Sequence, residues 1–289
     1  MTAVTSQVSF NEILVSSDFS DASANALSYA KSIAKRFGSH LVLVHVSDPG
    51  NPVTVPEGRW VEEAGNMIEE QMEATGIALR AEGFSAEAIN AYGSVKREIE
   101  TLAERHRADL VILGTHGRRG LSRLLFGSEA EGLMRYSDRP VLAVGPSARQ
   151  ASPEAWAPTN ILCATGLRPG AAKVVIYGYK LAQSVGAGFA LLSVDDPDHS
   201  SDDDQTWTVF EEALAKELPE EDIGRCQIRS LLSGKGPAAK IIDVARTLKP
   251  DLIVMGAKAS NFSSTHLPAG VLAQVLADAP CPVLTISID

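Results

Sequence analysis

The strongest constraint on the fold is that the second half of this chain repeats the first. Four short apolar segments recur in the same order, shifted by 148 positions at first (161 − 13 for two isoleucines) and by 142 later (252 − 110 for two leucines). This favours two copies of one domain over two unrelated α/β halves. The matched segments are 11–18 with 160–165, 39–46 with 187–194, 109–114 with 251–256 and 139–144 with 281–286.

The repeat also predicts the domain boundaries. Residues 145–158 contain three prolines and several small residues, a composition typical of a connection between domains. We therefore expect one domain over 1–146, a linker over 147–158 and a second domain over 159–289. Each domain would have an ordinary size for a domain.

The apolar segments are continuous rather than alternating, which is typical of strands that are covered on both faces in a parallel sheet. Stretches with helical spacing lie between them, namely 22–34, 62–81, 96–107 and 129–136, and Ser20 or Asp21 could cap the first. Strands that alternate with helices predict an α/β fold with two doubly wound domains in tandem.

Charge and composition exclude several classes of partner. The formal net charge is −10, which disfavours nucleic acid and anionic lipid as partners. The sequence has neither an apolar run long enough to span a membrane nor a start like a signal peptide, so we expect a cytoplasmic protein. Its three cysteines, Cys163, Cys226 and Cys281, are too scattered for a disulfide framework or a metal site.

One loop of the first copy has the composition of a phosphate site. Gly114-Thr-His-Gly117 follows a strand, and nine residues later Gly127-Ser128 opens a helical stretch. Glycines let the backbone approach a ligand, and a helix start offers free N–H groups to phosphate. Asp18, at the end of the first strand, would lie across the cleft, where its carboxylate could accept from ribose or hold a divalent cation.

Each of these residues also has an ordinary structural interpretation. The glycines could form a simple turn, Gly127-Ser128 could be a helix cap, and Asp18 could cap the first helix. His116 could be a structural loop residue, and the three nearby arginines could form a solvated loop face. The arginines are Arg118, Arg119 and Arg123.

Taken together, the residues resemble the universal stress protein family, and two such domains resemble its tandem class. The resemblance covers nearly all of both halves. It includes 13–20, 43–46, the glycine loop and Arg139-Pro-Val-Leu-Ala-Val144. It implies a five-stranded parallel sheet with helices on both faces in each domain. It also implies an ATP site, with Gly114, Gly117, Gly127 and Ser128 on the phosphates, Asp18 near the ribose or Mg²⁺, and the backbone of Val46 on adenine.

Two residues of the first copy depart from the pattern of ATP-binding members. Ser16 stands where these often have proline, which affects the geometry of the strand end. Glu129 follows Ser128 directly, and its carboxylate would weaken binding unless it points away from the phosphates or reaches the metal. We include both residues in the predicted site.

The second copy departs further. Gly256 remains, but Ala259 replaces the next glycine, Ala269-Gly270 replaces glycine-serine, and Gly166 replaces Asp18. We therefore expect this domain to be degenerate for ATP. His199 and Asp202-Asp-Asp204 lie on its equivalent edge, where a solvated acidic loop is the ordinary interpretation.

Three functions are compatible with this pattern. The first is an ATP-binding protein of stress response or signalling, with one nucleotide in the first domain and slow or no hydrolysis, because no general base is evident. The second is an interaction module that binds no nucleotide. The third is an enzyme of a related nucleotide-binding superfamily, although neither a Ser-Gly-Gly-x-Asp-Ser loop nor a His-x-Gly-His pair is present.

The resemblance also implies how the two copies assemble. Closing strands pair across a two-fold axis in this family, so Val141–Val144 and Val283–Ile286 could pair within one chain. A further homodimer is left open.

Overall fold

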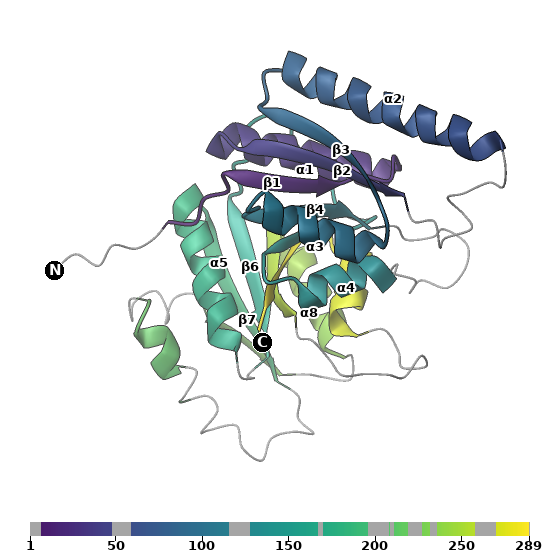
Figure 1. The fold of residues 1–289 in the computed structure, drawn as a ribbon. Coiled ribbons are helices and arrows are strands. Elements are labelled where there is room, and N and C mark those ends of the chain that lie inside the picture. The colour runs from purple at the N-terminus through teal and green to yellow at the C-terminus, as the bar shows by residue number, and fades with distance from the viewer. Residues whose placement is uncertain are drawn as a thin grey trace.

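The structure is a computed structural model of the chain (Figure 1). It describes residues 7–47, 59–115, 128–166, 170–195, 208, 211–218, 227–231, 236–257 and 270–288.

All the described strands belong to one ten-stranded sheet. Its order is β3-β2-β1-β4-β5-β10-β9-β6-β7-β8, so each half contributes five mutually parallel strands in the same internal order. The strands are β1 (Glu12–Ser16), β2 (His40–Ser47), β3 (Ala86–Tyr92), β4 (Leu110–Gly114), β5 (Val141–Val144), β6 (Asn160–Thr165), β7 (Gly188–Asp195), β8 (Gln227–Leu231), β9 (Leu252–Ala257) and β10 (Val283–Ser287). The fold expected from the sequence is confirmed.

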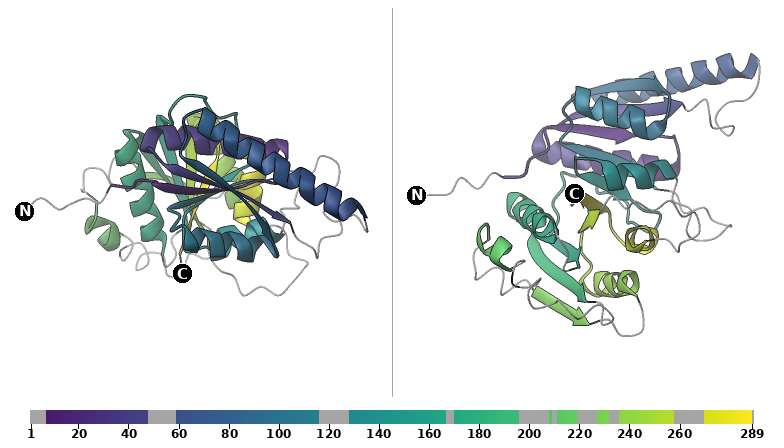
Figure 2. Two further views of the ribbon diagram at one scale, coloured as in Figure 1. Left: turned by 45° about the horizontal axis from the view of Figure 1, so that its top comes forward. Right: turned by 60° about the horizontal axis from the view of Figure 1, so that its bottom comes forward.

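Helices cover both faces of this sheet (Figures 1 and 2). Side chains of α1, α2 and α5 pack on one face, and those of α3, α4, α8 and α9 pack on the other. The helices are α1 (Asp21–Phe37), α2 (Arg59–Ala81), α3 (Val95–Arg105), α4 (Ser128–Tyr136), α5 (Ala171–Val185), α8 (Pro237–Leu248) and α9 (Val271–Asp278). No helix among the described residues is long and apolar enough to cross a membrane.

Helix α1 shows how the sequence sets the ends of an element. Ser20 is its N-cap, and the Ser20 hydroxyl accepts a hydrogen bond from the backbone N–H of Ser23 at 3.2 Å. Gly38 ends the helix in the left-handed conformation with φ of 71°. Of the three caps that the sequence offered, Asp18, Ser20 and Asp21, Ser20 is therefore the one used.

The two halves join through their closing strands. β5 and β10 pair antiparallel, with Leu142 opposite Leu284, so the predicted pairing within the chain is confirmed. The chain then passes under α9, where a Cβ atom on Gly145 would lie 2.2 Å from the carbonyl oxygen of Leu276. Only glycine fits at that point, because any other side chain would collide with the α9 backbone.

The segment between the halves is bound along α1. The Asn25 side chain donates to the Arg149 carbonyl at 3.3 Å and accepts from the Ala151 N–H at 3.2 Å. The Ser32 hydroxyl donates to the Glu154 carbonyl at 2.7 Å, and Trp156 is buried in the core. These contacts fix the path of the linker, which its prolines and small residues did not indicate.

In each half, an aspartate forms the same pair of hydrogen bonds at the edge where the strands begin. Asp109 accepts the N–H groups of Asn11 and Glu12, at 2.7 and 3.1 Å. Its counterpart Asp251 accepts those of Thr159 and Asn160, also at 2.7 and 3.1 Å. Each carboxylate thereby holds the start of the first strand of its half next to the fourth.

Candidate functional site

The candidate site lies at the carboxyl edge of the first half, where β1, β2 and β4 end. Asp18 is exposed, just beyond β1. Its Oδ1 atom accepts from the Ser20 N–H at 3.1 Å and from the Ser20 hydroxyl at 2.5 Å. Ser20 in turn caps α1. Asp18 therefore does not cap the helix itself but orients the residue that does, and its carboxylate stays at the edge.

The end of β1 is held against β2 by residues that the sequence analysis did not identify. His45 Nδ1 lies 2.9 Å from the Ser17 carbonyl, and the His45 ring stacks on Phe19 with 4.8 Å between centroids. Phe19 adopts a φ of 59°, which is unusual for a residue other than glycine. This turn fixes Asp18, and the only sequence signal for it was a histidine near the end of an apolar strand.

The backbone of Val46 lies at the same carboxyl edge, beyond the register of β1 on β2. The register of β1 on β2 ends where Ser16 pairs with Val44, and the Ser17 N–H donates to the Val44 carbonyl at 2.8 Å. Successive residues of a strand direct their peptide groups to opposite sides, so Val46 directs its N–H and C=O to the β1 side as Val44 does. Val46 lies beyond the last residue of β1, so its N–H and C=O face the space beside Asp18.

Gly114 is at the end of β4, and the structure gives a packing reason for its lack of a side chain. A Cβ atom there would lie 2.4 Å from the carbonyl carbon and oxygen of Ala22 in the first turn of α1. Thr115 follows, buried, with its N–H and hydroxyl both directed to the Val144 carbonyl. Because Gly114 has no side chain, the start of α1 can lie close to the end of β4.

Other predicted site residues lie partly or wholly outside the described part. Gly117, Gly127, His116 and the loop arginines fall in residues 116–127, which the structure does not describe. For Ser128 and Glu129 it describes only the backbone, which forms the first turn of α4. Of the predicted phosphate-binding groups, Gly114 and the start of α4 are thus placed.

The equivalent edge of the second half is built differently. Gly166 occupies the place of Asp18, with no atom within 4 Å of where its Cβ would be. Both α5 and α9 start at glycines, Gly170 and Gly270, without a side-chain cap. Ile288 packs here, 3.1 Å from the Cβ position of Gly256. Among the described residues, this edge therefore has no counterpart of the Asp18 carboxylate and no hydroxyl cap on α5 or α9. Ala259, Ala269, His199 and 202–204 lie outside the described residues.

The fold and this edge define a class of protein: two doubly wound α/β domains, with polar groups beyond the carboxyl ends of the strands in the first, as in nucleotide-binding proteins of this architecture. The profile of the universal stress protein family matches residues 9–145 and again 158–287. The chain therefore belongs to the universal stress protein family, as a tandem two-domain member, and the resemblance seen in its motifs is confirmed.

Individual relatives agree with this assignment. Universal stress protein MJ0531 of Methanocaldococcus jannaschii is 32% identical over 146 residues, which cover 47% of this chain and 82% of the relative. Universal stress protein MJ0577 of the same organism is 29% identical over 159 residues, covering 47% of this chain and 96% of the relative. A crystal structure of a universal stress protein from Archaeoglobus fulgidus covers 96% of this chain and 99% of its own, with a TM-score of 0.70 at 20% identity, and so supports the fold.

Proposed function

We propose that the protein binds one adenine nucleotide, as Mg²⁺·ATP, at the carboxyl edge of its first domain, and that it acts as a nucleotide-responsive protein of stress response or signalling. The observation that carries the proposal is the difference between the two edges. The first has an exposed carboxylate, a hydroxyl-capped helix and the peptide groups of Val46 beyond the register of β1, whereas the second has glycine at the equivalent of Asp18 and an isoleucine packed at the edge.

The first domain offers a binding group for each part of the nucleotide. The N–H and C=O of Val46 present one donor and one acceptor in a row, which suits the edge of an adenine ring. Asp18 would accept from the ribose hydroxyls or hold the metal, because a carboxylate is a ligand that Mg²⁺ prefers. The N-terminus of α4 at Ser128 would bind the phosphates, together with Gly117 and Gly127. Glu129 would turn away or reach the cation.

The proposal does not include efficient hydrolysis. A general base must reach the attacking water. His45 is engaged with the Ser17 carbonyl and the Phe19 ring. The protein would then respond to occupancy rather than to turnover, and we place it in the cytoplasm, where ATP is abundant.

Calorimetric titration of the full chain with Mg²⁺·ATP tests this function. We expect one nucleotide per chain. Asp18→Ala should weaken binding by about 10- to 100-fold, since it removes one charged hydrogen-bonding group. The matched control is Gly166→Ala at the equivalent position of the second half, which should leave affinity unchanged. Melting curves of both variants would verify that they are folded.

Mass spectrometry of the denatured, freshly purified protein gives an independent readout of a co-purified adenine nucleotide. A chain that arrives empty and gives no heat with millimolar Mg²⁺·ATP would exclude the proposal in favour of an interaction module that binds no nucleotide. Two nucleotides per chain would instead show that the second domain is functional.

A further inference from the structure

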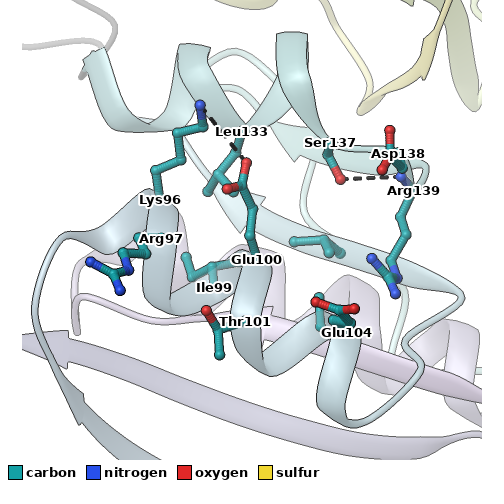
Figure 3. A pocket seen from close by; sticks show the side chains of 12 residues that line it. Lys96, Arg97, Ile99, Glu100, Thr101, Glu104, Leu133, Ser137, Asp138 and Arg139 are labelled. Atoms are coloured by element: carbon teal, nitrogen blue, oxygen red, sulfur yellow. Dashed lines mark hydrogen bonds and ion pairs between the residues drawn. The ribbon is translucent and has the colours of Figure 1, made fainter.

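A groove outside the nucleotide edge runs between α3 and α4 of the first half (Figure 3). Its volume is about 780 Å³. Its accessible lining is mostly polar, and the apolar side chains beneath it, Ile99, Val111 and Leu133, are buried. Charged residues of α3 and of the turn before β5 form its walls. A groove of this size with charged walls can hold part of a partner molecule of complementary charge.

The repeat shows that part of the charged lining of this groove has apolar counterparts in the second half. Positions in the two halves correspond at a shift of 142 (252 − 110), as the strand registers confirm. Lys96, Glu100 and Arg139 line the groove. Their counterparts in the second half are Ala238, Ile242 and Cys281, which are buried with 4%, 5% and 0% exposure. At these three positions the second half therefore has buried apolar side chains where the first half has charged ones.

The exposed side of α3 has an unusual order of charge. Arg97, Thr101 and Glu104 are exposed and recur at helical spacing, so they share one face. A cation in the first turn and an anion in the last oppose the helix dipole, and so slightly destabilise α3 by itself. Glu98 and Arg105 have the favourable order. The order of Arg97 and Glu104 along the groove side of α3 is thus not explained by a gain in helix stability.

This order is self-complementary under a two-fold rotation. If α3 of a second copy lay antiparallel over the groove, its Glu104 would meet the end lined by Lys96, Arg97 and Glu100, which has a net positive charge. Its Arg97 would meet the end lined by Glu104, Asp138 and Arg139, which has a net negative charge. Thr101, close to the midpoint of the face, would meet its own copy, and it is uncharged. In an isologous interface every such contact occurs twice.

We propose that the α3–α4 groove is the interface of a homodimer in which each α3 lies over the groove of the other copy. Ion pairs at both ends would fix the antiparallel orientation. Since β5 is already paired with β10 inside the chain, this interface differs from the pairing of closing strands.

Sedimentation velocity of the full 30.7 kDa chain over a concentration series tests the interface. We expect a reversible monomer–dimer equilibrium. Arg97→Glu or Glu104→Arg alone should each weaken it by about tenfold, because each places like charges together at two symmetric points. The double variant Arg97→Glu/Glu104→Arg should recover the dimer, since the swapped charges attract again.

The matched control is Arg105→Glu, a charge reversal of the same size on the same helix but off the groove face, which should leave the equilibrium unchanged. A chain that stays monomeric throughout the series would overturn the proposal. So would a dimer that both single variants leave intact, or a double variant that dissociates like the single ones. Circular dichroism of each variant would verify that α3 is still folded.

Discussion

Adding one methyl group at Gly114 should destabilise the protein more than the same change at Gly256 or Gly166 in the second half. In Gly114→Ala the new Cβ would lie 2.4 Å from the backbone of Ala22 and 2.6 Å from the Ser23 nitrogen. Backbone atoms cannot rotate away, so α1 or β4 must shift. Overpacking of a rigid site typically costs 1–3 kcal/mol, and we expect about 3 kcal/mol here. For a protein of this size the melting temperature would fall by roughly 6–12 °C.

The second half contains two graded controls. At Gly256 the Cβ would lie 3.1 Å and 3.2 Å from methyl groups of Ile288 and Val174, which can give way, so Gly256→Ala should cost about 1 kcal/mol. At Gly166 nothing lies within 4 Å and φ is not in the left-handed region, so Gly166→Ala should change stability by less than about 0.5 kcal/mol.

Differential scanning fluorimetry and urea unfolding of the three variants would measure this order. The reasoning is refuted if Gly114→Ala melts within about 2 °C of the wild-type chain. The same packing means that loss of ATP binding in a Gly114 variant would not identify a contact with phosphate. Asp18→Ala is therefore the sharper probe of the site.

Two other predictions concern titratable groups. Burial alone would raise the pKa of Asp251, but the donors of Thr159 and Asn160 outweigh it and hold that pKa below its ordinary value. Asp251 therefore contributes stability above about pH 4 that is lost as pH falls, so Asp251→Asn should lower the free energy of unfolding by about 1–2 kcal/mol at pH 7, and less near pH 3, in urea titrations. Burial raises the pKa of the Cys281 thiol to about 12 and also raises that of Cys163. In a Cys226→Ser background we expect no labelling by a maleimide at pH 7 until the protein unfolds, and rapid labelling of the native chain would contradict this burial.

Much of the fold was predictable from the sequence because its signals are local. Continuous apolar runs located β1, β2, β4 and β5 to within a few residues, since strands covered on both faces need them. The residues of β3 had no such signal. Its sequence Ala-Glu-Ala-Ile-Asn-Ala-Tyr is only partly apolar because the strand lies at the edge of the sheet and is partly exposed.

The site was predictable in kind but not in detail. The sequence placed Asp18 and Gly114 at one edge, because carboxyl ends of parallel strands meet there. It could not show that Ser20 engages Asp18, or that Gly114 packs on Ala22, because these contacts depend on how α1 crosses β4. The groove between α3 and α4 was not foreseen at all.

The antiparallel joint of β5 and β10 has a consequence for biosynthesis. About 140 residues separate Val144 from Val283 (283 − 144 = 139), so at ordinary translation speeds the edge of β5 waits roughly 7–28 s for its partner. During that time the nascent first domain exposes an apolar strand edge that could pair with another chain. A ribosome that stalls in the second half would therefore leave an aggregation-prone intermediate, and fast emergence of the last strand would protect the protein as it is made.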